Sequence, residues 1–422
     1  MSFANHYLLK QDRRYSQSAE YLAIAPYLIV VIPCYNEPNL GETILSLFNC
    51  IDPAQKVLLL IVVNDAENDP QNIKKQNLDS LAALSLLKKN SPAFIELHWI
   101  YATNLPTKHA GAGWARKIGM DWAVSVFNKT GNSDGIIVSL DADTTVASNY
   151  FAAIAAHFKI YPDDVGTSIY FEHPVSDDEQ GEAISLYELY MRYYKNAVRL
   201  TGFPHSIYTV GSCFTVKADA YVAQGGMNRK KAGEDFYFLH KLSQRGHIGE
   251  INNTMVIPSS RLSDRVPFGT GPALQKYING SDELKLSYPL EAIQLLKPFF
   301  DKVDLLFSID KITPSTLSDN PVFQQFITST NFLAELNELK SNCSTGKVFR
   351  KRFFHLFNAF KIIKWLNFAI VNSYPKVDLM IESQKLIQMI EPENEITDCN
   401  TKRLLNFFRD FDKTTNFNTF AS

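Results

Sequence analysis

Short apolar runs alternate with longer stretches of helical periodicity through the first half of the chain. The runs at residues 28–33, 56–63, 94–101 and 136–140 have the length of strands, and the second is apolar enough to be covered on both faces. Residues 39–50, 78–87 and 112–127 carry apolar side chains at helical spacing. This order predicts an α/β fold with a mostly parallel central sheet flanked by helices.

The pattern changes beyond about residue 282. β-branched runs disappear there, and phenylalanines fill the apolar positions of a helical pattern, at residues 299, 300, 307, 323, 326 and 332. A segment rich in glycine and proline at 267–280 precedes the change. We therefore expect an N-terminal extension at 1–25, an α/β domain at 26–280 and an all-helical C-terminal part at 281–422.

Composition narrows the class of protein. A length of 422 residues suggests two or three domains, and a net charge of -2 excludes an overall attraction to nucleic acid. Five cysteines without CxxC spacing indicate neither a zinc site nor a disulfide framework. The chain has no run of 18 uncharged apolar residues and no secretory signal pattern. We expect a soluble protein in the reducing cytoplasm.

Carboxylates follow two of the predicted strands. Asp65 comes after the second strand, and Asp141 and Asp143 follow the fourth. Ligands of open α/β sheets bind at the carboxyl ends of the strands, so these side chains are expected on one edge. The spacing of Asp141 and Asp143 lets both meet one hard cation such as Mg²⁺ or Mn²⁺. The alternative is that all three are turn residues, as Asp often is.

Two further groups of charged residues stand near predicted helix starts. Glu234 and Asp235 open a helix, where a carboxylate either complements the helix dipole or serves as a general base. Lys108 and Arg116 flank the glycine-rich stretch before another helix, which offers cationic and backbone N–H partners for a phosphate. Neither a Walker A loop nor a GxGxxG motif after the first strand is present.

Six ordered segments carry a family resemblance, namely PCYNE (33–37), VVNDAEND (62–69), GAGWARKIG (111–119), SLDADT (139–144), GGM (225–227) and GEDF (233–236). Together they resemble a family 2 glycosyltransferase with a GT-A fold, over about residues 26–260. The resemblance implies an inverting, metal-dependent transfer of a sugar from a nucleoside diphosphate donor.

The resemblance also implies roles for individual residues. Pro33, Tyr35 and Glu37 would line the nucleotide pocket, and Asp65 would meet the base. Asp141 would contact the ribose or the metal, Asp143 would bind the metal, and Asp235 would be the catalytic base. The chain departs from the usual motifs at Asn64, Ala66, Glu67 and Lys117. These departures bear on the donor's base and sugar more than on the reaction.

Arg261 and Arg265 follow the last predicted strand, where a closing segment could place them on a diphosphate. The alternative is a pair of surface arginines near Asp264. The QxxRW motif of processive members is missing.

We expect a hexosyltransferase that uses a UDP-sugar and a glycan or lipid-linked glycan acceptor, in surface glycan or polysaccharide synthesis. The alternatives are an inactive nucleotide-sugar-binding partner subunit and a sugar nucleotidyltransferase.

Residues 346–376 contain five lysines, two arginines and no acidic residue. On a wheel for one continuous helix, most of the basic side chains share one arc and phenylalanines and aliphatic residues share the other. Such a helix suits contact with the anionic inner face of a membrane. The alternative is a helix of the protein core with a solvated basic face.

Overall fold

The computed structural model describes residues 2–11, 25–108, 110–228, 233–262, 269–393 and 400–415. The chain forms two compact units. The first, here called the sheet unit, takes up 1–174, 209–272 and 412–422, and the second, here called the helical unit, takes up 175–208 and 273–411. Each unit is therefore assembled from segments that are distant in the sequence.

The sheet unit is built on an eight-stranded sheet of order β3-β2-β1-β4-β7-β6-β8-β5. Its strands are β1 (Leu28–Cys34), β2 (Val57–Ala66), β3 (Ile95–Leu105), β4 (Ile136–Ser139), β5 (Thr145–Val146), β6 (Gly166–Phe171), β7 (Phe214–Lys217) and β8 (Ile248–Ile257). β1 pairs in parallel with β2 and β4, whereas β7 is antiparallel to β4 and β6. Every residue of β1 and β2 is buried, as continuous apolar runs predict.

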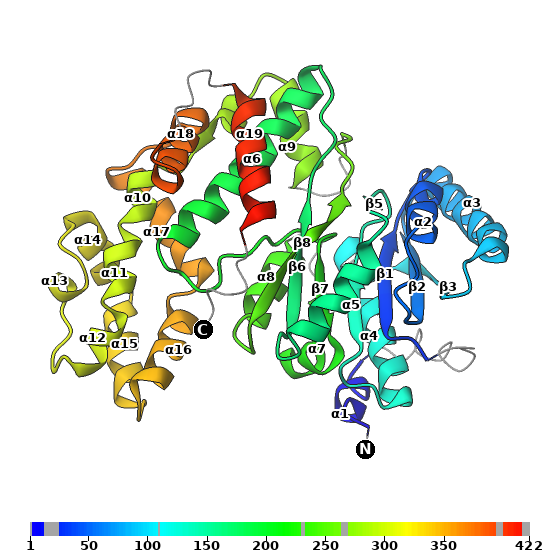
Figure 1. Ribbon diagram of the computed structural model, residues 1–422, viewed down its shortest axis with the longest axis horizontal. Coiled ribbons are helices and arrows are strands. Elements are labelled where there is room, and N and C mark those ends of the chain that lie inside the picture. The colour runs from blue at the N-terminus through cyan, green and yellow to red at the C-terminus, as the bar shows by residue number, and fades with distance from the viewer. Residues whose placement is uncertain are drawn as a thin grey trace. The chain divides into compact units, whose positions relative to one another are not determined.

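Helices flank this sheet (Figure 1). They are α1 (Asn5–Leu8), α2 (Leu40–Phe48), α3 (Gln71–Leu87), the 3₁₀ turn Lys88–Asn90, α4 (Ala112–Thr130), α5 (Tyr150–Ile160), α7 (Ala218–Gln224) and α8 (Glu234–Leu242). The central helix α4 packs closely on β1, because a Cβ added at Gly119 would lie 2.4 Å from Val31 Cγ1. The arrangement confirms the predicted α/β fold of the GT-A type.

The helical unit begins with α6 (Glu179–Leu200) and contains most of α9 (Thr270–Ile278) and α19 (Thr401–Thr414). Between the last two lie the 3₁₀ turn Asp282–Lys285, α10 (Leu290–Gln294), α11 (Leu296–Asp301), α12 (Val303–Ser308), α13 (Pro314–Leu317), α14 (Pro321–Ser329), α15 (Phe332–Ser341), α16 (Gly346–Leu356), α17 (Ala359–Asn372) and α18 (Leu379–Ile390). A two-residue strand, β9 (Leu286–Ser287), pairs with β10 (Val377–Asp378).

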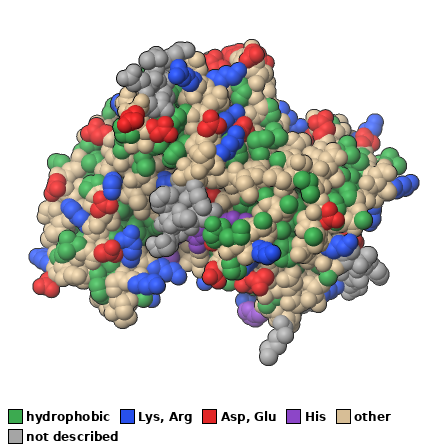
Figure 2. Space-filling view, in the orientation of Figure 1, with side chains coloured by type: hydrophobic (Ala, Val, Ile, Leu, Met, Phe, Trp, Pro, Cys, Tyr) green, Lys and Arg blue, Asp and Glu red, His purple; other side chains and the backbone are tan. Residues whose placement is uncertain are grey.

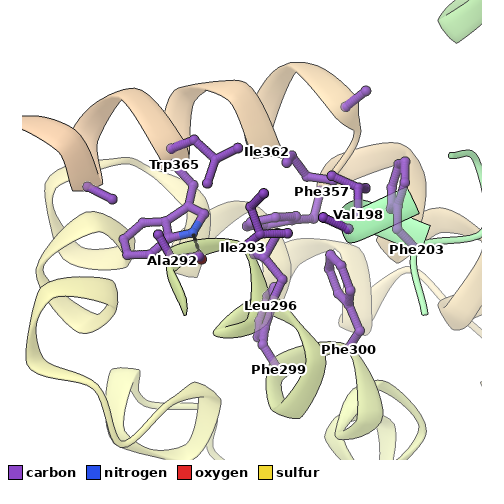
Figure 3. Packing of buried hydrophobic residues seen from close by; sticks show 14 of the residues in the cluster. Val198, Phe203, Ala292, Ile293, Leu296, Phe299, Phe300, Phe357, Ile362 and Trp365 are labelled. Atoms are coloured by element: carbon purple, nitrogen blue, oxygen red, sulfur yellow. Dashed lines mark hydrogen bonds between the residues drawn. The ribbon is translucent and has the colours of Figure 1, made fainter. Parts of the chain in front are cut away.

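Aromatic rings fill the core of the helical unit (Figure 3). The Phe299 ring lies 4.9 Å from that of Phe357 and 5.1 Å from that of Phe323, at the tilted or edge-on angles that aromatic pairs prefer. The buried indole of Trp365 donates its N–H to the carbonyl of Ala292 at 2.9 Å. The phenylalanines of the sequence pattern thus pack against one another.

Residues 346–376 do not form one helix, so the wheel that predicted a single amphipathic face was wrong. α16 ends at Leu356, and the side chain of Asn358 accepts hydrogen bonds from the backbone N–H groups of Phe360 and Lys361 to start α17. Phe349 and Phe353 are buried in the core of the helical unit. The core-helix alternative therefore describes these apolar side chains.

No helix among the described residues has the length and apolar character needed to cross a bilayer. On the face shown in Figure 2, lysines and arginines are interspersed with acidic and apolar side chains. That mixture agrees with a net charge of -2.

Candidate active site

Strand direction brings the predicted carboxylates to one edge of the sheet. β2 and β4 both run parallel to β1, so their carboxyl ends lie on the same side. Asp65 is the last residue but one of β2. Asp141 and Asp143 lie in the loop that follows β4. Pro33 lies near the same end of β1, opposite Val62 of β2.

Arg116 is the centre of one charged cluster at this edge. It sits in the first turns of α4 with 2% of its surface exposed. Its Nη2 donates to Asp141 Oδ1 at 2.6 Å, and its Nη1 donates to Glu234 Oε1. The predicted phosphate partner is therefore held by two carboxylates from the loop after β4 and the start of α8.

Asp235 belongs to the same cluster. A Cβ added at Gly211 would lie 3.0 Å from Arg116 Nη2 and 3.2 Å from Asp235 Oδ2, so the glycine leaves room for both groups. Burial and then the neighbouring charge of Glu234 raise the pKa of Asp235 to about 6, against the opposing effect of Arg116. The carboxyl group can thus change its protonation state near neutral pH.

Arg261 is the centre of a second cluster. Its Nη1 donates to Glu37 Oε1 at 2.9 Å, and its Nη2 bonds both Glu37 Oε2 and, at 2.8 Å, Asp143 Oδ2. Glu37 is 1% exposed, and its Oε1 also accepts the backbone N–H of Asn39 at 3.0 Å. The structure thus joins residues from the loops after β1, β4 and β8. Arg265 lies outside the described residues.

Asp65 lies in a third group. Its Oδ1 accepts the backbone N–H of Asn104 at 2.8 Å. Its Oδ2 is buried, and among the described residues no donor bonds it. Burial, followed by the charge of Asp65, raises the pKa of Tyr101 to about 12. The buried Oδ2 of Asp65 is therefore suited to accept a hydrogen bond from an N–H group of a ligand.

The remaining predicted residues lie in loops of the sheet unit. The hydroxyl of Tyr35 donates to Asp69 Oδ1 at 3.1 Å. Lys108 is exposed in the loop before α4, and its neighbour His109 lies outside the described residues.

Sequence reasoning missed a network behind the site, on α4. The ammonium group of Lys117 bonds Asp121 at 2.8 Å and Gln11 at 2.9 Å, and the hydroxyl of Tyr7 donates to Asp121 at 2.6 Å. Lys117 stands where the family motif has Asn. This departure was the available signal, and its partners in the N-terminal segment lie more than 100 residues away.

The site offers few side chains for a metal ion. Within the described part of the chain, no group of three His, Cys, Asp or Glu side chains could hold one. Asp141 and Asp143 supply carboxylate oxygens, which suit a hard cation that also binds substrate phosphates. The donor set therefore fits Mg²⁺ or Mn²⁺ carried on a diphosphate better than a cation held by protein alone.

Residues 29–222 match the model of glycosyl transferase family 2. No curated protein matches the chain at a significant level. Among solved structures, S. aureus TarS 1–349 in complex with UDP-GlcNAc has 13% identity and a TM-score of 0.37, covering 93% of this chain and 90% of that one. The same TarS segment with UDP has 14% identity and a TM-score of 0.32, covering 93% and 90%.

The family match spans the loops that carry Glu37, Asp65, Asp141 and Asp143, together with Arg116 of α4. It ends before Glu234 and Asp235.

Proposed function

We propose that this chain, whose residues 29–222 form a glycosyl transferase family 2 domain, transfers a sugar from a nucleoside diphosphate donor to a hydroxyl group with inversion at the anomeric carbon. The observation that carries the proposal is the gathering of Asp141, Glu234 and Asp235 around Arg116 at the carboxyl edge of the strands. The donor is a UDP-sugar, the sugar is a hexose, and the acceptor is a glycan or lipid-linked glycan.

The group around Asp65 supports nucleotide binding. The buried Oδ2 of Asp65 is an acceptor suited to the N–H group of a uracil ring. Pro33 and Tyr35 lie at the neighbouring strand end and line the same pocket in this proposal. Lys108 is exposed in the loop before α4, where a cation can meet the diphosphate.

Asp143 and Asp141 would hold the metal ion together with diphosphate oxygens. When bound, Mg²⁺ or Mn²⁺ neutralises the charge that develops on the departing diphosphate. Asp141 Oδ1 accepts a hydrogen bond from Arg116, and this ion pair fixes the orientation of the carboxylate and so of its other oxygen. The chain's own contribution is to fix these carboxylates before the donor arrives.

Asp235 would act as the general base. A carboxylate with a pKa of about 6 is ionised at neutral pH and still basic enough to accept the proton of an attacking hydroxyl group. A single displacement needs one base and inverts the anomeric carbon. Glu234 stays bound to Arg116 and positions the start of α8, so only one member of the pair need touch the acceptor.

The test is release of UDP from candidate UDP-sugars in the presence of Mg²⁺ or Mn²⁺. Asp235→Asn is expected to lower turnover by about 10²-fold or more, as the loss of a general base does, with UDP affinity within a few fold of the parent. Asp219→Asn, at the start of α7, is the matched control. Turnover at the parental rate in Asp235→Asn would refute the role. UDP binding without turnover by the parent would instead favour a binding subunit.

Contact of residues 346–376 with an anionic membrane, on the cytoplasmic face, belongs to the same proposal. Because Phe349 and Phe353 are buried, the contact would rest on exposed basic side chains such as Lys347, Lys351 and Lys364. Flotation with anionic vesicles, compared with neutral ones, tests it. Failure to float with either would remove the membrane contact.

A further inference from the structure

A single guanidinium group bridges two carboxylates at the predicted metal site. Arg261 bonds both oxygens of Glu37 with its two Nη atoms, and the same Nη2 reaches Asp143 Oδ2 at 2.8 Å. Asp143 is the residue proposed to bind the metal. A positive charge of the protein itself therefore lies on the carboxylate that would hold the metal ion.

We propose that Arg261 is an internal cation that occupies Asp143 in the resting enzyme and leaves it when the metal-bound donor enters. This inference rests on the proposed function, since it concerns the same site. It assigns Arg261 a role toward the chain's own carboxylates that precedes any contact with a diphosphate.

The two arms of this bridge differ in exposure. The side chain of Glu37 is 1% exposed, whereas those of Asp143 and Arg261 are 29% and 27% exposed. A buried carboxylate that loses its cation is strongly penalised, while an ion pair open to water is separated at small cost. Arg261 can therefore release Asp143 and remain anchored on Glu37.

Arg116 shows the opposite arrangement. Its side chain is 3% exposed, and its two ion pairs, to Asp141 and Glu234, tie together separate elements of the sheet unit. Moving it would leave a buried charge without its partners. Of Arg116 and Arg261, the latter is the one whose contact can be exchanged.

The experiment measures Mn²⁺ binding to the full chain by electron paramagnetic resonance, without nucleotide. Arg261→Gln removes the competing charge, so we expect its Mn²⁺ affinity to rise about fivefold, the scale of one partly exposed ion pair. The gain is expected to vanish when Asp143→Asn is added. Arg245→Gln, at an exposed arginine of the sheet unit, is the control and should match the parent.

A second measurement needs no substitution. Mn²⁺ is expected to increase the reaction of Arg261 with phenylglyoxal in the parent protein, followed by mass spectrometry of the peptide, and to leave Arg245 unaffected. Unchanged or weaker Mn²⁺ binding by Arg261→Gln would overturn the inference. So would a reaction of Arg261 with phenylglyoxal that is slower when Mn²⁺ is present. If Mn²⁺ affinity rises while no UDP-sugar is turned over, the proposed function fails and this inference stands. If UDP-sugar is turned over while the Mn²⁺ affinity of Arg261→Gln does not rise, this inference fails and the proposed function stands.

Discussion

The carboxyl group of Asp235 lies in surroundings that disfavour its negative charge. It is partly buried beside Glu234, and these two effects raise its pKa against the cation of Arg116 and the backbone N–H of Phe236, which donates to Asp235 Oδ1 at 2.8 Å. Active-site carboxylates are often held in this way, because a base with a raised proton affinity accepts a proton more readily. The position of Asp235 at a helix start was predictable from sequence. Its pKa was not, since that depends first on burial and also on Arg116, which lies more than 100 residues earlier.

The raised pKa predicts an acid limb in the activity. Asp235 must be ionised to accept a proton, so UDP release in saturating donor is expected to fall as pH drops through about 6. A profile from pH 4.5 to 8.5 checks this. A rate that stays level down to pH 4.5 would exclude Asp235 as the titrating base.

The same shift predicts a gain in stability for Asp235→Asn. A carboxyl group whose pKa is higher in the folded state than in the unfolded chain destabilises the fold once it ionises. This loss of folding stability develops as pH rises from the pKa of the unfolded chain, about 4, to the pKa of the folded state, about 6. It is fully present at pH 8. Asp235→Asn should therefore melt at a higher temperature than the parent at pH 8, and at nearly the same temperature at pH 4. Equal melting at both pH values would contradict the shift.

At the scale of elements, β1, β2 and β4 were predictable because each begins in a short, uninterrupted apolar run. Parallel pairing then placed Asp65, Asp141 and Asp143 at one edge without any knowledge of contacts. The break between α16 and α17 was not found, because the basic and apolar arcs continue across it. Asn358 was its only local signal, and its capping role depends on its backbone conformation.

The docking of α1 is an element-scale feature that can be tested with two neighbouring glycines. Gly225 and Gly226 both have positive φ, but a Cβ at Gly226 would lie 2.0 Å from the hydroxyl oxygen of Tyr7, whereas nothing lies within 4 Å of one at Gly225. Gly226→Ala is expected to lower the free energy of unfolding by about 1–3 kcal/mol more than Gly225→Ala. Urea denaturation of both variants measures the difference.

Adding Tyr7→Phe supplies the control. Tyr7→Phe removes the hydroxyl oxygen that a Cβ at residue 226 would meet, so it should restore part of the unfolding free energy lost in Gly226→Ala. In the parent the same substitution should be destabilising, because the hydroxyl donates to Asp121. Equal effects of the two glycine substitutions would show that Tyr7 does not pack at Gly226 in solution.

At the scale of the whole molecule, the helical unit depends on a segment from the middle of the chain. Leu186, Leu189, Tyr193 and Ala197 of α6 lie in the same hydrophobic core as Phe299 and Trp365. A boundary predicted from composition follows the order of the sequence, so it cannot express a core made from 175–208 together with 273–411. That assembly requires tertiary contacts, which periodicity does not contain.

This dependence predicts that the fragment 281–422 does not fold alone. Without α6 the core keeps an apolar face open to water, and the lost burial of several large side chains, at about 1.5–3 kcal/mol each, exceeds the stability of an ordinary domain. The fragment should show weak near-ultraviolet dichroism and no cooperative melting, unlike the full chain. A sharp thermal transition in the fragment would show that α6 is dispensable.

The buried residues Leu404 and Phe408 of α19 complete that core, about 200 residues after α6 in the sequence. During synthesis, α6 emerges from the ribosome long before these partners exist. Its apolar side must wait, exposed or shielded by a chaperone, until residues 404 and 408 have also been translated. Premature termination even a short way upstream of α19 would therefore yield a chain that quality-control proteases recognise as unfinished.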